Sequence, residues 1–139
     1  MIFDLFKRKK NKTVETGILS EAEEKWNKMW SLWANGEIES PYNELMNYQG
    51  EVTNGGHYQY FLNTESNGDV RKELEILCDF LPDVMKNNLQ AAFNAYLELE
   101  QDKNVDNNEA IITKCDNVFS NNEKTINEIL ENFCKTIDL

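Results

Sequence analysis

Residues 51–63 read EVTNGGHYQYFLN and contain the most distinctive turn in this chain. The tripeptide Asn54-Gly55-Gly56 stops a helical apolar pattern, because residues without a Cβ adopt positive φ at little cost. We therefore predict a positive φ at Gly55 or Gly56. The aromatic segment that follows, residues 57–62, is expected to form a short helix, with a strand as the alternative.

Helical periodicity dominates the rest of the chain. Apolar residues recur every three or four positions, whereas apolar and polar residues seldom alternate over the length of a strand. A chain of 139 residues can bury a core without disulfides or metals. We predict an all-α protein, a compact single-domain bundle of about six to eight helices. In this prediction residues 1–17 form a basic and apolar tail, and residues 18–139 form one acidic helical domain.

Local capping patterns place the first helices. Ser20 with Glu23 three residues later is a capping box, and Asn35-Gly36 ends the helix that it opens. The inner face of this helix carries three tryptophans and two smaller residues: Ala22, Trp26, Met29, Trp30 and Trp33. A core face is the preferred interpretation, and a binding platform is the alternative. Ser40-Pro41 begins a second helix, since proline suits the first helical position.

Two more helices follow the aromatic segment. Residues 63–68 are expected to form a loop, after which Asp69 caps a helix that ends at Leu81. Pro82 supports that boundary because proline restricts the residue before it. The next helix is predicted over residues 82–99.

Two capping patterns divide the remaining residues. Asp106 with Glu109 is expected to open one helix, after a connector over residues 100–108. Ser120 with Glu123 is expected to open a separate C-terminal helix.

The chain lacks the residue patterns of an enzyme. Its one histidine, His57, lies between a glycine turn and aromatic residues, so a packing role is preferred to a catalytic one. Three cysteines lack C-x-x-C spacing and are interpreted as small core residues: Cys78, Cys115 and Cys134. The sequence contains no phosphate-binding loop and no calcium loop. We assign no catalytic residue, no cofactor and no metal ligand.

Acidic residues outnumber basic ones by 25 to 14, which gives a net charge of −11. This charge repels the phosphates of nucleic acids, so we expect no direct nucleic-acid binding and a basic partner instead. The candidate partner-binding residues fall into two stretches: Glu37, Glu39, Glu44 and Glu51 in the first, and Glu98, Glu100, Asp102, Asp106 and Glu109 in the second. A surface that only keeps the protein soluble is the alternative for either stretch.

The N-terminal segment MIFDLFKRKKNK, residues 1–12, places its basic residues after its apolar ones. A secretory signal has the reverse order, so we expect a cytoplasmic protein. The apolar runs are also too short to span a bilayer. Contact with an anionic membrane surface is one interpretation of this segment, but a solubilising tail is preferred and no stable membrane association is expected.

Seven residues of the glycine turn match the pattern N-G-G-hydrophobe-x-Q-[YF]-[FL]-x-N: Asn54, Gly55, Gly56, Gln59, Tyr60, Phe61 and Asn63. This stretch resembles the signature of the bacterial DNA-mimic protein family, small acidic helical proteins that include many domains of unknown function. His57 stands where the family usually has a hydrophobe, often Phe. We therefore expect His57→Phe to preserve or raise stability.

The side chains of this motif have a mainly structural interpretation. Tyr60 and Phe61 are expected to enter the core. Asn54, Gln59 and Asn63 are expected to satisfy backbone groups that the chain reversal leaves unpaired. The motif therefore indicates a fold more directly than an activity.

The resemblance implies a function for the acidic surface. In characterised relatives such a surface imitates the phosphates of DNA and binds a DNA-binding protein. We expect a non-enzymatic interaction protein, in its specific form a DNA mimic whose partner is a basic DNA-binding protein. The alternative is an interaction or immunity-type module that uses an apolar or aromatic surface. The resemblance also allows a homodimer.

Overall fold

Five helices make up most of residues 19–139, the part of the chain that the computed structural model describes. They are α2 (Glu21–Ala34), α3 (Tyr42–Asn67), α4 (Val70–Phe80), α5 (Asp83–Glu100) and α6 (Val105–Cys134). No strand occurs among the described residues, so the predicted all-α class is confirmed for them. The predicted tail, residues 1–17, lies outside the described part of the chain.

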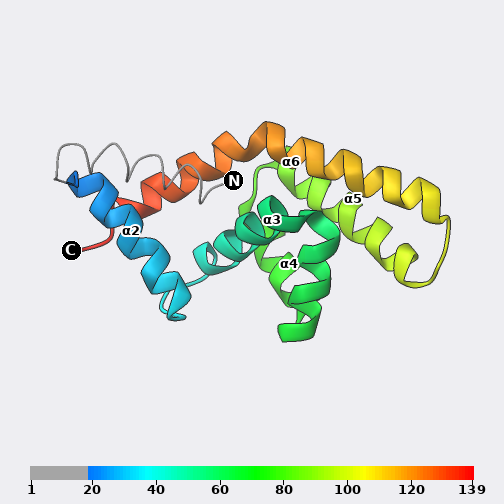
Figure 1. The fold of residues 1–139 in the computed structure, drawn as a ribbon, viewed down its shortest axis with the longest axis horizontal. Coiled ribbons are helices and arrows are strands. Elements are labelled where there is room, and N and C mark those ends of the chain that lie inside the picture. The colour runs from blue at the N-terminus through cyan, green and yellow to red at the C-terminus, as the bar shows by residue number, and fades with distance from the viewer. Residues whose placement is uncertain (1–18) are drawn as a thin grey trace.

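The longest helix, α6, forms the spine of an elongated molecule (Figure 1). Helix α5 runs antiparallel to it and makes the most extensive helix pair. Helices α3 and α4 pack against the middle of this pair, and α2 lies across the C-terminal end of α6. The Lys28 ammonium on α2 donates to the backbone carbonyl of Asp138. The start of α2 and the α5–α6 connection therefore lie at opposite ends of the molecule.

One apolar core joins the described helices. Each helix contributes at least one side chain that is fully removed from solvent: Met29, Leu45, Leu77, Leu89 and Ile126. Tyr60 and Phe61 are also fully buried, as predicted from the motif. Cys115 and Cys134 are buried and Cys78 is half-buried against the same core. The cysteines therefore pack as small apolar residues.

Two of the predicted side-chain caps are present. The Ser20 hydroxyl accepts a hydrogen bond of 3.1 Å from the backbone N–H of Glu23. The Asp69 carboxylate accepts one of 3.2 Å from the backbone N–H of Lys72. Each bond satisfies a backbone donor that has no partner inside its helix. Helix α4 then gives way to extended backbone at Leu81, as the following proline predicts.

The predicted count of six to eight helices is not confirmed. Helix α3 continues through the Asn54-Gly55-Gly56 turn with a kink at Gly56, and α6 passes Ser120 without interruption. Residues 63–67, predicted as a loop, extend α3, so the break before α4 is shorter than predicted. The Ser120 hydroxyl donates to the backbone carbonyl of Asp116 at 3.2 Å, a bond within the helix rather than a cap. The buried face continues across this point from Phe119 to Ile126. Continuous packing thus outweighs the local capping pattern.

The start of α6 also differs from the prediction. Asp106, the expected cap, lies inside the first turn, and Asn104 precedes the helix with a φ of 44°. The buried side chain of Asn108 donates to the backbone carbonyl of Lys103 at 2.9 Å. No capping pattern in the sequence indicates this bond. It satisfies the backbone carbonyl of Lys103 in the α5–α6 connector, where a capping box was predicted.

Candidate functional site

Helix α3 changes direction at Gly56, inside the glycine turn. Gly56 has φ 81° and ψ 178°, so the backbone leaves the helical conformation there, and the predicted positive φ is confirmed. A Cβ at this position would lie 2.7 Å from Oδ2 of Asp116 on α6. Glycine is therefore required both by the backbone conformation and by the close approach of α6. The kink divides α3 into a first half, residues 42–55, and a second half, residues 57–67.

His57 connects this kink to α6. Its side chain is 0% exposed, and both its backbone N–H and its ring Nδ1 bind Oδ1 of Asp116, at 2.9 Å and 2.7 Å. Its Nε2 lies 2.7 Å from the hydroxyl of Tyr48. Every polar atom of the imidazole thus has a partner, which fits the packing role predicted for this residue.

Tyr48 provides the partner of the second imidazole nitrogen. Burial raises the pKa of the Tyr48 phenol far above its ordinary value, so the hydroxyl keeps its proton. This hydroxyl shares one hydrogen bond with Nε2, and Nδ1 shares another with the Asp116 carboxylate. Tyr48, His57 and Asp116 thus form a continuous hydrogen-bonded chain from the first half of α3 through the kink to α6.

Two polar residues of the motif join the halves of α3 through a carboxylate. Gln59 and Asn63 donate side-chain N–H groups to Oε2 of Glu51, at 3.2 Å and 2.8 Å. The expectation that these amides satisfy unpaired backbone groups is corrected here, because their partner is a side chain of the first half. Asn54, the third polar residue of the motif, is exposed.

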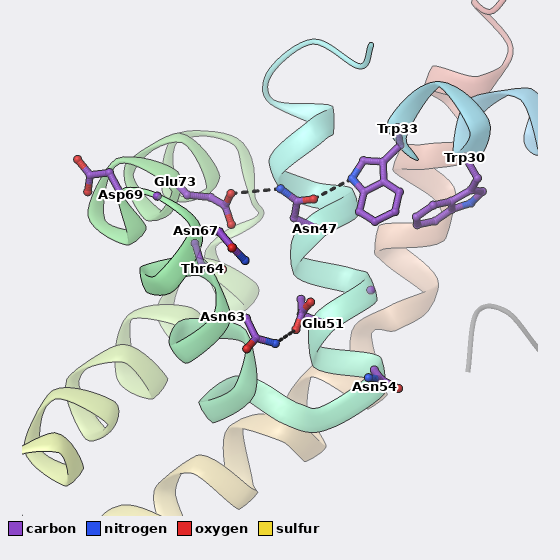
Figure 2. A pocket seen from close by; sticks show the side chains of 12 residues that line it. Trp30, Trp33, Asn47, Glu51, Asn54, Asn63, Thr64, Asn67, Asp69 and Glu73 are labelled. Carbon is purple, nitrogen blue, oxygen red and sulfur yellow. Dashed lines mark hydrogen bonds between the residues drawn. The ribbon is translucent and has the colours of Figure 1, made fainter. Parts of the chain in front are cut away.

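A cavity of about 550 Å³ lies between α2, the two halves of α3 and the start of α4 (Figure 2). We call it the kink cavity. Its lining combines indoles, carboxylates, amides, a hydroxyl and two glycines: Trp30, Trp33, Asn47, Gly50, Glu51, Asn54, Asn63, Thr64, Asn67, Gly68, Asp69 and Glu73. Its volume lies in the range of small-molecule sites.

A hydrogen-bonded chain forms one wall of the kink cavity. The indole Nε1–H of Trp33 donates to Asn47 at 2.8 Å, and the Asn47 amide donates to Oε1 of Glu73 at 3.3 Å (Figure 2). The hydroxyl of Tyr60 donates to the other oxygen of Glu73. Burial raises the pKa of the Glu73 carboxyl above its ordinary value, and these two donors partly oppose that effect.

The predicted tryptophan face divides between the core and the cavity. Trp26 and Met29 are buried, as a core face requires, but Ala22 is exposed. Trp30 and Trp33 are partly exposed and line the kink cavity, with ring centroids 5.4 Å apart in an edge-to-face arrangement. The preferred interpretation as a core face is therefore wrong for Ala22. Trp30 and Trp33 pack against the core with one part of the side chain and remain accessible with another.

The second predicted acidic stretch lies at the end of the molecule where α5 connects to α6 (Figure 1). We call it the acidic tip, and all of its members are exposed: Glu98, Glu100, Asp102, Asp106 and Glu109. The hydroxyl of Tyr58 donates to Glu100 at 2.5 Å, which connects the tip to the second half of α3.

The first predicted acidic stretch is not one continuous surface. Glu37 and Glu39 are exposed, but Glu44 is only 9% exposed and accepts a hydrogen bond of 2.9 Å from Ser40. Glu51 lines the kink cavity. Glu37 and Glu39 precede α3, whereas Glu44 and Glu51 lie two turns apart on one face of that helix. The stretch is therefore divided between an exposed connector and a partly buried helix face.

Sequence reasoning missed Asn47, Glu73 and Asp116. Asn47 and Glu51 are one helical turn apart and therefore share a face, a pattern that could have grouped them. Glu73 adjoins the apolar positions Val70 and Leu74, which indicates a carboxylate turned partly inward. No local pattern marks Asp116, because its partner is 59 residues away.

No family model, curated protein or solved structure matches this chain. The resemblance of residues 54–63 to the DNA-mimic signature therefore stands on those residues alone. Within residues 19–139, no group of three or more histidine, cysteine or acidic side chains is arranged to hold a metal ion. None of the described helices is long and apolar enough to cross a membrane.

Proposed function

We propose that this protein is a non-enzymatic interaction protein that binds a basic partner through its acidic tip. In the specific form of this proposal the tip imitates DNA and the partner is a basic DNA-binding protein. The observation that supports the proposal most directly is the exposure of all five acidic side chains at the connection between two packed helices.

The placement of these carboxylates suits an ordered charge array better than a diffuse one. Glu98 and Glu100 lie in the last turn of α5, and Asp106 and Glu109 lie in the first turns of α6. Asp106 and Glu109 are one helical turn apart on α6 and are separated by about 4.5 Å along its axis, whereas the phosphates of one DNA strand lie about 3.4 Å apart along theirs. Lys103 is the one basic residue between positions 98 and 109, so the local charge is strongly negative.

A second candidate function is supported by a groove at the tip. Its lining includes Tyr58, Leu99, Val105 and Ile112, together with Asp102 and Glu109 of the tip itself: a mixture of apolar and acidic side chains. Such a groove fits an apolar interaction module, in which packing rather than charge supplies most of the affinity.

The experiment compares charge reversal at the two ends of the molecule. The full chain carrying Glu98→Lys, Glu100→Lys and Asp102→Lys is used to capture DNA-binding proteins from a cell lysate, at low and at high salt and with duplex DNA as competitor. The matched control carries Glu24→Lys, Glu128→Lys and Glu131→Lys, which are exposed and lie toward the opposite end. Both variants change the net charge by the same amount.

A DNA mimic should retain a DNA-binding protein that duplex DNA displaces and that high salt releases. The tip variant should lose this protein, and the control variant should keep it. Capture that ignores salt, added DNA and the tip substitutions would favour the apolar module instead.

A further inference from the structure

The kink cavity is a concave site lined by acidic side chains without basic ones among the described residues. Three acidic residues line it, Glu51, Asp69 and Glu73, and no lysine, arginine or histidine is among its described lining residues. Neither Glu51 nor Glu73 has a basic side chain within ion-pair distance among the described residues. Within residues 19–139 the cavity therefore has acidic side chains and no internal counter-charge.

The two inner carboxylates are held in place but keep free acceptor positions. Glu51 accepts from Gln59 and Asn63, and Glu73 accepts from Asn47 and Tyr60. A carboxylate has about four lone-pair positions, so roughly half of them remain on each group. All four donors are neutral, which means that they orient the carboxylates without cancelling their charge.

A further buried acid, Glu44, does not line the cavity but acts electrostatically on Glu73. Glu44 is one helical turn before Asn47, is 9% exposed, and its Oε1 has no hydrogen-bond partner. Its charge acts on Glu73 and contributes, after burial, to the raised pKa of that carboxyl. A buried carboxylate oxygen without a donor is costly, and a cation bound to Glu73 would reduce the repulsion between these two acids.

The tryptophan side of the cavity determines what kind of cation fits. Trp30 and Trp33 present indole rings at the α2 end of the hydrogen-bonded wall, and Glu73 lies at its α4 end (Figure 2). Indole faces attract organic cations and also pack against methylene groups. A bare metal ion would use neither property, and a cavity of about 550 Å³ is far larger than a metal ion needs.

We propose that the kink cavity binds a small aliphatic amine with two or more ammonium groups, a polyamine. Its ammonium groups bind Glu51 on the first half of α3 and Glu73 on α4, and its methylene chain packs against Trp30 and Trp33. Asn63, Thr64 and Asn67 supply further oxygen acceptors along the second half of α3. This inference is separate from the proposed function, because the cavity and the acidic tip share no residue.

Isothermal titration of the full chain with spermidine at physiological salt tests the proposal. We expect saturable one-to-one binding, weaker binding of n-butylamine, which has one ammonium group, and no comparable binding of Mg²⁺. A short lysine-rich peptide carries the same ammonium groups and is titrated in parallel. A clear preference for the peptide over spermidine would overturn the assignment to a free amine.

A matched pair of variants separates the cavity from the general acidity of the protein. Glu51→Gln with Glu73→Gln should weaken spermidine binding about tenfold or more, since it removes both charged ligands. Glu98→Gln with Glu109→Gln removes the same charge from the acidic tip and should change the affinity less than about twofold. Equal losses in both variants would show non-specific attraction and overturn the proposal.

A second pair keeps the test decisive if the double cavity variant does not fold. Asn67→Lys places a fixed ammonium group at the exposed rim of the cavity, where it should compete with the amine and weaken binding about tenfold. Asn87→Lys makes the same change at an exposed site on α5 outside the cavity and should have little effect. Circular dichroism confirms the fold of each, and unchanged affinity in Asn67→Lys would contradict the proposed site.

Discussion

Asp116 holds His57 by two hydrogen bonds to a single carboxylate oxygen, 2.7 Å from the ring Nδ1 and 2.9 Å from the backbone nitrogen. The two residues are 59 positions apart, and their contact fixes the kink of α3 against the middle of α6. The contact also places the two halves of α3 on either side of the kink cavity. His57, the one histidine of the sequence, therefore fixes the position of the kink relative to α6.

This arrangement changes the expectation for His57→Phe. The resemblance to a family with Phe at this position predicts unchanged or higher stability, whereas the structure predicts a loss. Phenylalanine leaves the buried Tyr48 hydroxyl without its partner, which should cost about 1–3 kcal/mol in urea unfolding. The double variant Tyr48→Phe with His57→Phe should lose less than the sum of the single variants. Wild-type stability in His57→Phe would contradict this role of His57.

The kink predicts opposite effects for the same substitution at two glycines of α3. Gly56→Ala should destabilise the protein by about 1 kcal/mol or more, because φ is 81° and the new Cβ would meet Asp116 at 2.7 Å. Gly50→Ala has nothing within 4 Å of its new Cβ and lies in a helical stretch, so it should stabilise by about 0.5–1 kcal/mol. Thermal unfolding measures both, and equal effects would refute the proposed strain at Gly56.

Glu73 should make stability depend on pH. Burial raises its pKa in the folded state, so the protonated acid is favoured by folding and its contribution is lost as pH rises. The groups that act on it are the Tyr60 hydroxyl, the Asn47 amide and the Glu44 carboxylate. Glu73→Gln removes this titration, so its stability relative to the wild type should improve between about pH 4 and pH 7. A constant difference across that range in urea unfolding would contradict the raised pKa.

The two serines predicted as helix caps should respond differently to alanine. Ser20→Ala removes the bond to the Glu23 N–H and should cost about 1 kcal/mol. Ser120→Ala lies inside α6 at an exposed position, where alanine favours helix, so it should be neutral or stabilise by a few tenths of a kcal/mol. Chemical denaturation measures the free energy of unfolding of both variants. An equal loss at Ser120 and at Ser20 would contradict the continuity of α6 through Ser120.

Features that depend on a few neighbouring residues could be predicted from the sequence. The all-α class follows from apolar spacing, and the caps at Ser20 and Asp69 follow from side chains that reach a backbone donor three residues away. The positive φ of Gly56 follows from the low cost of that conformation for glycine. Each of these features is determined within about one helical turn.

Only the tertiary structure decided the continuity of α6, the burial of Glu44 and the pairing of His57 with Asp116. The kink cavity belongs to the same class, because its walls come from three helices whose contacts no local pattern encodes. Ser120 shows the reason most directly: a cap contributes about 1 kcal/mol, whereas burying the apolar side chains on both sides of it contributes more. Where packing and local preference compete, the larger buried area determines the outcome.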